Sequence, residues 1–222
     1  MTPFPSPNFG ARRGGVTPSL IVIHYTAMAS CAEARARLCD PAVEVSAHWL
    51  ISETGIAEAL VPETARAWHA GAGMWAGLDD INSHSIGIEL ANTGSQPFPE
   101  RQMATLETLL RAIMARWAIA QHQVIAHSDM APARKGDPGR RFDWRRLALA
   151  GLSVWPDAAG DASSDLAASL DAIGYPQAGA NDRLTAFRLR FRPWGQGPET
   201  AEDRAQADAV ARIFAARAAE TA

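Results

Sequence analysis

The stretch Ser19-Leu20-Ile21-Val22-Ile23-His24 decides the fold, because a short apolar run rich in β-branched residues is typical of a buried strand. The run ends at His24, so the imidazole of His24 is predicted to lie at the end of the strand, where a loop begins. Four more segments carry strand signals and are bounded by turn residues. They are residues 47–51, 56–61, 85–90 and 123–126.

Helices are predicted between these strands. Residues 30–39 form one, and residues 99–119 form the longest, with Pro99 and Glu100 suited to its first turn. Its apolar stripe at helical spacing consists of Met103, Leu106, Leu110, Ile113, Met114 and Trp117. Strands interspersed with two helices predict a layered α/β or α+β domain.

The composition changes at residues 153–164, where Pro, Gly, Asp, Ser and Ala dominate. We interpret this segment as a linker between a domain at 1–152 and a small C-terminal module at 165–222. Three helices are predicted within the module, at residues 165–173, 181–191 and 200–219.

Composition and charge exclude several classes of protein. The 222 residues carry a net charge of −3 with no basic run, which disfavours a nucleic-acid partner held through phosphates. The longest apolar runs are far too short to span a bilayer. Lys135 is the single lysine among 21 basic residues. Oligomeric state is not readable from the sequence, and a monomer is the default expectation.

The compartment is predicted from the N-terminus and the cysteines. Residues 1–15 lack the apolar segment of a secretory signal, and no lipid-attachment cysteine is visible. Cys31 and Cys39 lie eight positions apart in a predicted helix, roughly 12 Å at about 1.5 Å per residue, which is too far for a disulfide. Two reduced thiols favour the cytoplasm, with the periplasm as the alternative.

Two strand-end histidines and a carboxylate form the candidate reactive group. His127 follows the last predicted strand, and the Pro- and Gly-rich segment after it can fold back to place Asp137 beside it. With His24, these side chains are a donor set typical of catalytic zinc. From spacing alone, the alternative is two buried histidines and a turn-forming Asp-Pro.

Five blocks in this order resemble one known family. They are Val22-Ile23-His24-Tyr25-Thr26-Ala27, Ser46-Ala47-His48-Trp49-Leu50-Ile51, Ala67-Trp68-His69-Ala70-Gly71, Ser85-Ile86-Gly87-Ile88-Glu89 and His127-Ser128-Asp129-Met130-Ala131-Pro132-Ala133-Arg134-Lys135-Gly136-Asp137-Pro138-Gly139. Together they resemble the zinc-dependent N-acetylmuramoyl-L-alanine amidases of the AmpD and AmiD kind, over about residues 18–147. The resemblance implies a mixed β-sheet flanked by helices, a fold shared with a phage lysozyme and the peptidoglycan recognition proteins.

The resemblance also implies roles for individual residues. His24, His127 and Asp137 would bind Zn²⁺, Glu89 would be the general base, and Lys135 would stabilise the oxyanion. These residue types agree with amide hydrolysis, which needs an activated water, positive charge at the carbonyl oxygen and a proton for the leaving amine.

Four further residues are predicted to border the cleft and contact substrate by their motif positions: His69, Trp75, Asn92 and Tyr25. Packing on Trp68 is the alternative for His69, and packing or turn formation is the alternative for Trp75 and Asn92. His48 lies inside a strand pattern and is predicted to be structural.

The predicted function is zinc-dependent hydrolysis of the amide between N-acetylmuramic acid, or its 1,6-anhydro form, and L-alanine, in cell-wall turnover or recycling. The alternatives are a non-catalytic peptidoglycan-recognition module and a phage-type endolysin. Residues 170–175 and 186–193 resemble the small helical peptidoglycan-binding module of AmiD-type enzymes, and a helical cap on the catalytic domain is the alternative. The sequence leaves the choice between intact peptidoglycan and anhydromuropeptide open.

Overall fold

The structure is a computed structural model that describes the backbone of residues 6–221 and the side chains of residues 6–217. Its main sheet has the strand order β4 (Ala57–Ala59), β3 (Trp49–Ile51), β6 (Ser85–Leu90), β2 (Leu20–Tyr25) and β7 (Val124–Ala126). The β3–β4 pair is antiparallel, whereas the other neighbours run parallel. A short antiparallel pair joins β1 (Phe9–Gly10) to β5 (Arg66–Ala67). The prediction of a mixed sheet is therefore confirmed.

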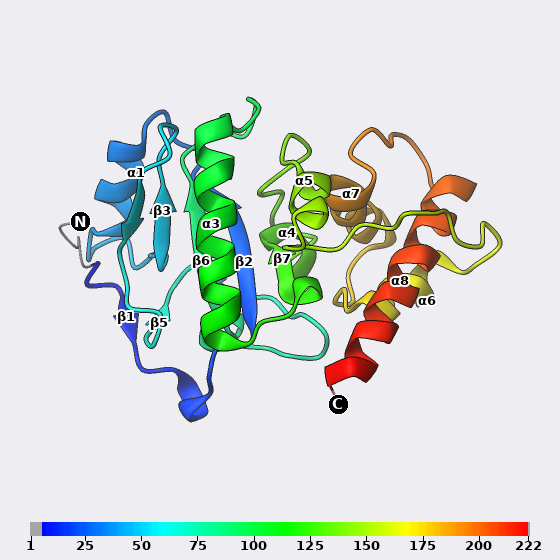
Figure 1. The fold of residues 1–222 in the computed structure, drawn as a ribbon, viewed down its shortest axis with the longest axis horizontal. Helices are drawn as coiled ribbons and strands as arrows, with labels where there is room; N and C mark the ends of the chain where they lie inside the picture. The colour runs from blue at the N-terminus through cyan, green and yellow to red at the C-terminus, as the bar shows by residue number, and fades with distance from the viewer. Residues whose placement is uncertain (1–5, 222) are drawn as a thin grey trace.

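Helices flank this sheet on both faces (Figure 1). They are α1 (Cys31–Leu38), α2 (Ile81–His84), α3 (Glu100–Trp117), α4 (His127–Met130), α5 (Trp144–Leu149), α6 (Leu166–Ile173), α7 (Ala180–Phe191) and α8 (Ala201–Thr221). Two 3-10 turns occupy Arg13–Gly15 and Gln121–Gln123. In the described part of the chain no helix is both long and apolar enough to cross a membrane.

Side-chain alternation along the strands gives the sheet two different faces. On β6, Ile86, Ile88 and Leu90 belong to the cluster that packs under α3 and α5. Ser85, Gly87 and Glu89 alternate with them and therefore point to the opposite face. The other strands follow the same rule, and on β2 His24 shares its face with Leu20 and Val22. The polar strand residues thus gather on the face that α3 does not cover.

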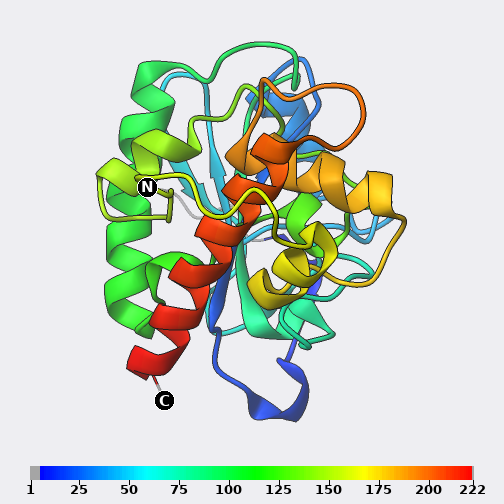
Figure 2. The same ribbon diagram turned by 90° about the vertical axis from the view of Figure 1, so that its right-hand side faces the viewer.

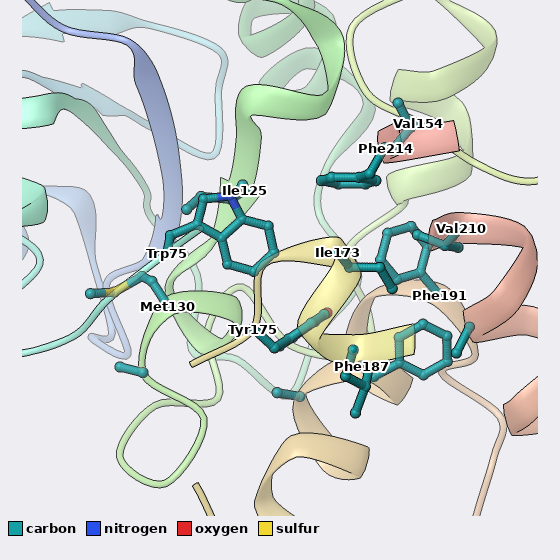
Figure 3. Packing of buried hydrophobic residues seen from close by; sticks show 14 of the residues in the cluster. Trp75, Ile125, Met130, Val154, Ile173, Tyr175, Phe187, Phe191, Val210 and Phe214 are labelled. Carbon is teal, nitrogen blue, oxygen red and sulfur yellow. The ribbon is translucent and has the colours of Figure 1, made fainter. Parts of the chain in front are cut away.

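The C-terminal helices pack on that second face, toward the β7 edge of the sheet (Figures 1 and 2). One hydrophobic cluster contains strand residues and residues of α6, α7 and α8 together. Figure 3 shows its aromatic centre, which includes Trp75, Tyr175, Phe187, Phe191 and Phe214. Burial of so much apolar surface is the main force that holds these helices to the sheet.

A buried ion pair adds a specific link between the C-terminal helices and the sheet. Asp129 on α4 and Arg190 on α7 are both fully buried, with 2.6 Å between Asp129 Oδ2 and Arg190 Nη1. The Tyr175 hydroxyl donates to Asp129 Oδ1 at 2.8 Å, and the backbone N–H of Ala126 donates to Oδ2 at 2.9 Å. The carboxylate is therefore fully paired, as a buried charge must be.

Several sequence-based expectations need adjustment at this level. Residues 127–130 begin the segment predicted to fold back, and they form the helical turn α4. The elements β5 and α2 lie between residues 62 and 84, where the sequence predicts neither a strand nor a helix. The predicted linker begins with Ser153 and Val154, which are buried, and Val154 packs in the cluster shared with α6–α8. This packing is what the helical-cap alternative requires. The domain boundaries and a peptidoglycan-binding role of the C-terminal module stay predictions.

Candidate active site

The parallel strands bring three of the predicted site residues to one end of the sheet. His24 on β2 pairs in register with Glu89 on β6. On the other side of β2, Ile23 pairs with Ala126, so His127 follows β7 beside the position of His24. These are the carboxyl ends of parallel strands, where α/β sheets commonly bind ligands.

The loop after α4 returns Asp137 to the same place, as the Pro- and Gly-rich sequence predicted. The backbone N–H of Ser128 donates to the carbonyl of Asp137 at 3.0 Å and fixes the return. Asp137 Oδ2 lies 2.9 Å from His127 Nδ1 and 3.0 Å from His24 Nδ1, and the two Nδ1 atoms are 2.9 Å apart. Among the described residues, His24, His127 and Asp137 form a group able to hold a metal ion.

The protonation chemistry of this group fits a metal. His127 Nε2 lies 3.0 Å from the carbonyl oxygen of Ala70, which only accepts, so Nε2 carries the proton and the Nδ1 lone pair faces the group. Burial, together with His127, lowers the pKa of His24 to about 4. Burial raises the pKa of Asp137, but the two histidines outweigh it and the net shift is strongly downward. Neutral imidazoles and a carboxylate are the forms that bind cations.

Glu89 stands beside this group with one unpaired oxygen. Its Oε2 is buried and has no hydrogen-bond partner among the described residues. Burial raises the pKa of Glu89 to about 8, with a further upward contribution from Asp137 and an opposing one from Lys135. A carboxyl with a pKa near neutrality can take up a proton and release it again, as a general base and acid must.

A cleft of about 450 Å³ opens over these residues and is lined by His24, Glu89, His127 and Asp137. Lys135, the residue predicted to stabilise the oxyanion, is exposed and lines the same cleft. Two arginines in the lining, Arg37 on α1 and Arg134, were not predicted from the sequence. The signal for Arg134 was available, because it directly precedes Lys135 in the 127–139 block. Arg37 offered none, since a helix arginine is usually solvated.

Two of the four predicted substrate contacts also line the cleft, Tyr25 and His69. His69 is nearly buried, and both its ring nitrogens face protein atoms. Nδ1 lies 3.0 Å from His24 Nε2, and Nε2 lies 3.2 Å from the Ser85 hydroxyl. No ring nitrogen of His69 is left for a hydrogen bond to substrate. The predicted contact between His69 and substrate could therefore be made only through the carbon edge of the ring.

The prediction that Trp75 borders the cleft is wrong. Trp75 is 2% exposed and packs edge-on against Tyr175 and Phe214 in the cluster under the C-terminal helices (Figure 3). Packing, the alternative considered for it, is its role.

Asn92 is not part of the cleft lining either. It is buried, and its Oδ1 accepts the backbone N–H of Gly94 at 2.7 Å, so the side chain forms a turn after β6. His48 is structural as predicted, because its Nδ1 accepts the backbone N–H of Gly87 at 2.9 Å.

Comparisons with known proteins show which family the chain matches. Residues 14–140 match the family model described as N-acetylmuramoyl-L-alanine amidase. The chain is 37% identical to the N-acetylmuramoyl-L-alanine amidase AmiD of Escherichia coli, across 86% of this chain and 81% of the relative. It is 33% identical to the 1,6-anhydro-N-acetylmuramyl-L-alanine amidase AmpD of the same organism, across 64% of this chain and 87% of that protein.

Solved structures extend the match to the whole fold. E. coli AmiD in complex with anhydro-N-acetylmuramic acid-L-Ala-D-gamma-Glu-L-Lys superposes with a TM-score of 0.80 at 32% identity, covering 93% of this chain and 98% of that one. AmpDh3 from Pseudomonas aeruginosa, solved with an anhydromuramic pentapeptide, also gives 0.80, at 27% identity and with 96% and 99% coverage. The chain is an enzyme of the N-acetylmuramoyl-L-alanine amidase family.

Proposed function

We propose that this amidase is zinc-dependent and cleaves the amide between the lactyl group of N-acetylmuramic acid, or of its 1,6-anhydro form, and L-alanine. One observation carries the proposal. Two Nδ1 atoms and a carboxylate oxygen lie 2.9–3.0 Å from one another at the floor of a cleft that also contains Glu89. The substrate names attached to the AmiD, AmpD and AmpDh3 relatives support the choice of bond.

His24, His127 and Asp137 would hold the ion as two nitrogen donors and one oxygen donor. This set suits Zn²⁺, whose catalytic sites commonly use three protein ligands and keep a fourth position open. When bound, zinc supplies Lewis acidity that polarises the scissile carbonyl and makes a water more acidic.

Glu89 performs the proton transfers. Its unpaired Oε2 accepts the proton of the attacking water, and the raised pKa makes the resulting carboxylic acid stable near neutral pH. The same group then delivers that proton to the nitrogen of L-alanine as the amide bond breaks. The leaving amine departs neutral, and Glu89 returns to its carboxylate form.

Lys135 supplies positive charge from the rim of the cleft. Its exposed ammonium lies on the loop that ends at Asp137, so metal ligand and lysine are positioned by one segment. A charge placed where the carbonyl oxygen becomes negative stabilises the transition state more than the substrate.

Metal analysis joined to a turnover assay tests the proposal. The purified chain is expected to hold about one zinc per molecule and to release peptide from muropeptides. A chelator should abolish release, and added Zn²⁺ should restore it. Unchanged hydrolysis after complete metal removal would refute zinc dependence, and binding without cleavage would favour a non-catalytic recognition module.

The form of the substrate is tested by mass spectrometry of the products from intact sacculi and from anhydromuropeptide monomers. We propose the anhydromuropeptide as a substrate, because relatives of the AmpD and AmiD kind carry this compound in their names or structures. Product from sacculi alone would contradict this. The compartment in which the enzyme works stays a prediction.

A further inference from the structure

A chain of hydrogen bonds behind the metal ligands connects Ser85 to His24 through His69. Ser85 Oγ lies 2.6 Å from the carbonyl oxygen of Ile81 and 3.2 Å from His69 Nε2. On the other side of the ring, His69 Nδ1 lies 3.0 Å from His24 Nε2. All three side chains are buried or nearly so, so water competes little for these contacts.

The direction of each bond follows from the donors and acceptors available. The Ile81 carbonyl only accepts, so the single hydroxyl proton of Ser85 points to it. Ser85 Oγ must then accept from His69, which places the proton of that neutral ring on Nε2. His69 Nδ1 is left as an acceptor for the Nε2–H of His24. The Nδ1 of His24 is therefore bare and faces Asp137 and His127.

The backbone of the same segment serves the second histidine ligand. The Ala70 carbonyl accepts from His127 Nε2, which leaves the Nδ1 of His127 bare as well. Asn82 holds this segment in place, because its Oδ1 accepts the backbone N–H groups of both His69 and Ala70, at 3.0 and 2.8 Å. The two neighbouring residues His69 and Ala70 therefore fix the tautomers of both histidine ligands, His24 and His127.

The strand beneath His69 leaves space for its ring. A Cβ added at Gly87 would lie 2.4 Å from His69 Cγ, far inside a normal contact distance. The ring can occupy this position only because β6 has no side chain there. Ser85, two residues earlier on the same face of β6, then meets Nε2 of the ring.

We propose that His69 and Ser85 are positioning residues of the metal site, which hold the ring of His24 with its Nδ1 lone pair directed at the cation. The inference rests on the proposed metal site and adds roles for two residues outside the ligand set. Partners of this kind typically contribute a factor of about 10–100 in metal affinity.

The test compares zinc dissociation constants, measured by competition with a chromogenic chelator, for Ser85→Ala, Ser85→Thr and Ser153→Ala. Ser85→Ala should weaken zinc binding by about 10–100-fold. Ser85→Thr keeps the hydroxyl and should restore most of the affinity. Ser153 is also a buried serine but lies beside Arg190, away from the cleft, so its alanine variant should bind zinc normally.

A second readout, long-range ¹⁵N NMR of the imidazoles, reports the proton positions directly. The inference requires His69 to be neutral with its proton on Nε2, in zinc-loaded and metal-free protein alike. A proton on Nδ1 of His69, or wild-type affinity in Ser85→Ala, would overturn it. Failure of the wild-type chain to bind zinc would instead refute the proposed zinc dependence, while the tautomer of His69 could still be measured.

Discussion

His24 and Glu89 occupy the same register position on adjacent parallel strands, β2 and β6. Neighbouring strands lie about 4.8 Å apart, so the register alone puts the imidazole of a proposed metal ligand and a carboxylate side by side. Because side chains alternate, both groups point to the face opposite α3. The central pair of strands therefore fixes how the proposed metal ligand and the proposed proton-transfer group lie relative to each other, without help from a loop.

Glu89→Gln should lower turnover by about 10² or more while zinc binding is retained, because the amide has nearly the same shape but cannot take a proton. Steady-state kinetics on a muropeptide, together with metal analysis of the same sample, check this. Glu33→Gln, a change at an exposed position on α1, serves as the control and should leave turnover unchanged. Turnover near the wild-type value in Glu89→Gln would remove Glu89 from the mechanism.

Lys135→Ala should reduce kcat by about 10²–10³, which is the usual cost of losing one oxyanion donor. Lys135→Arg keeps the charge but replaces a compact ammonium by a broad, planar fork, so we expect weak recovery at best. KM and zinc content should change little in either variant. Arg140→Lys, an exposed change on the same loop, is the matched control. Full activity of Lys135→Arg would mean that the single lysine of the chain has no special role.

The central elements and the residues of the candidate metal site were predictable because the signal of each individual segment is local. Residues 85–90 alternate strictly between large aliphatic and small or polar side chains, and the structure forms β6 over those six residues. The stripe in residues 99–119 likewise gives α3 within two residues at its C-terminal end. Pro and Gly around Asp137 indicated a loop able to turn back, and the loop does so.

Contacts between distant parts of the chain could not be predicted from local sequence patterns. Trp75 lies in a loop whose local sequence suits a cleft border, yet its position is decided by Tyr175 and Phe214, about 100 or more residues later. Arg190 and Asp129, 61 positions apart, form their pair only once α7 packs on the sheet. His69 was placed at the cleft by its motif, but its contacts with His24 and Ser85 depend on three segments meeting.

Arg190→Met should cost about 3–5 kcal/mol of unfolding free energy, because it leaves the fully buried Asp129 carboxylate without its cation. Urea unfolding followed by far-UV circular dichroism measures this. Arg212→Met removes a guanidinium that is 68% exposed and pairs with Asp208 on α8, so a loss below about 1 kcal/mol is expected. Equal losses in the two variants would show that the buried pair adds nothing beyond a surface pair.

The start of α8 should make stability depend on pH through Asp203. Burial raises the pKa of this carboxyl, but hydrogen bonds from Arg188, Arg192 and Thr200 outweigh it and hold the pKa well below its usual 3.8. A carboxyl whose pKa is lower in the folded state stabilises the protein fully above its unfolded-state pKa. This contribution is lost as the pH falls from the unfolded-state pKa through the lower folded-state pKa. Asp203→Asn removes the charge at every pH.

The wild-type chain should therefore exceed Asp203→Asn in stability by several kcal/mol at pH 7, as expected for a buried carboxylate paired with two guanidiniums. The difference should begin to shrink as the pH is lowered below about 4, because the carboxyl of the unfolded wild-type chain then becomes protonated while the folded-state carboxyl, with its lowered pKa, stays ionised to lower pH. Urea unfolding of both proteins between pH 3 and 7 measures it, and Asp208→Asn, at a partly buried position on the same helix, is the control. A difference that stays constant across this range would mean that Asp203 acts through packing and helix capping rather than through its charge.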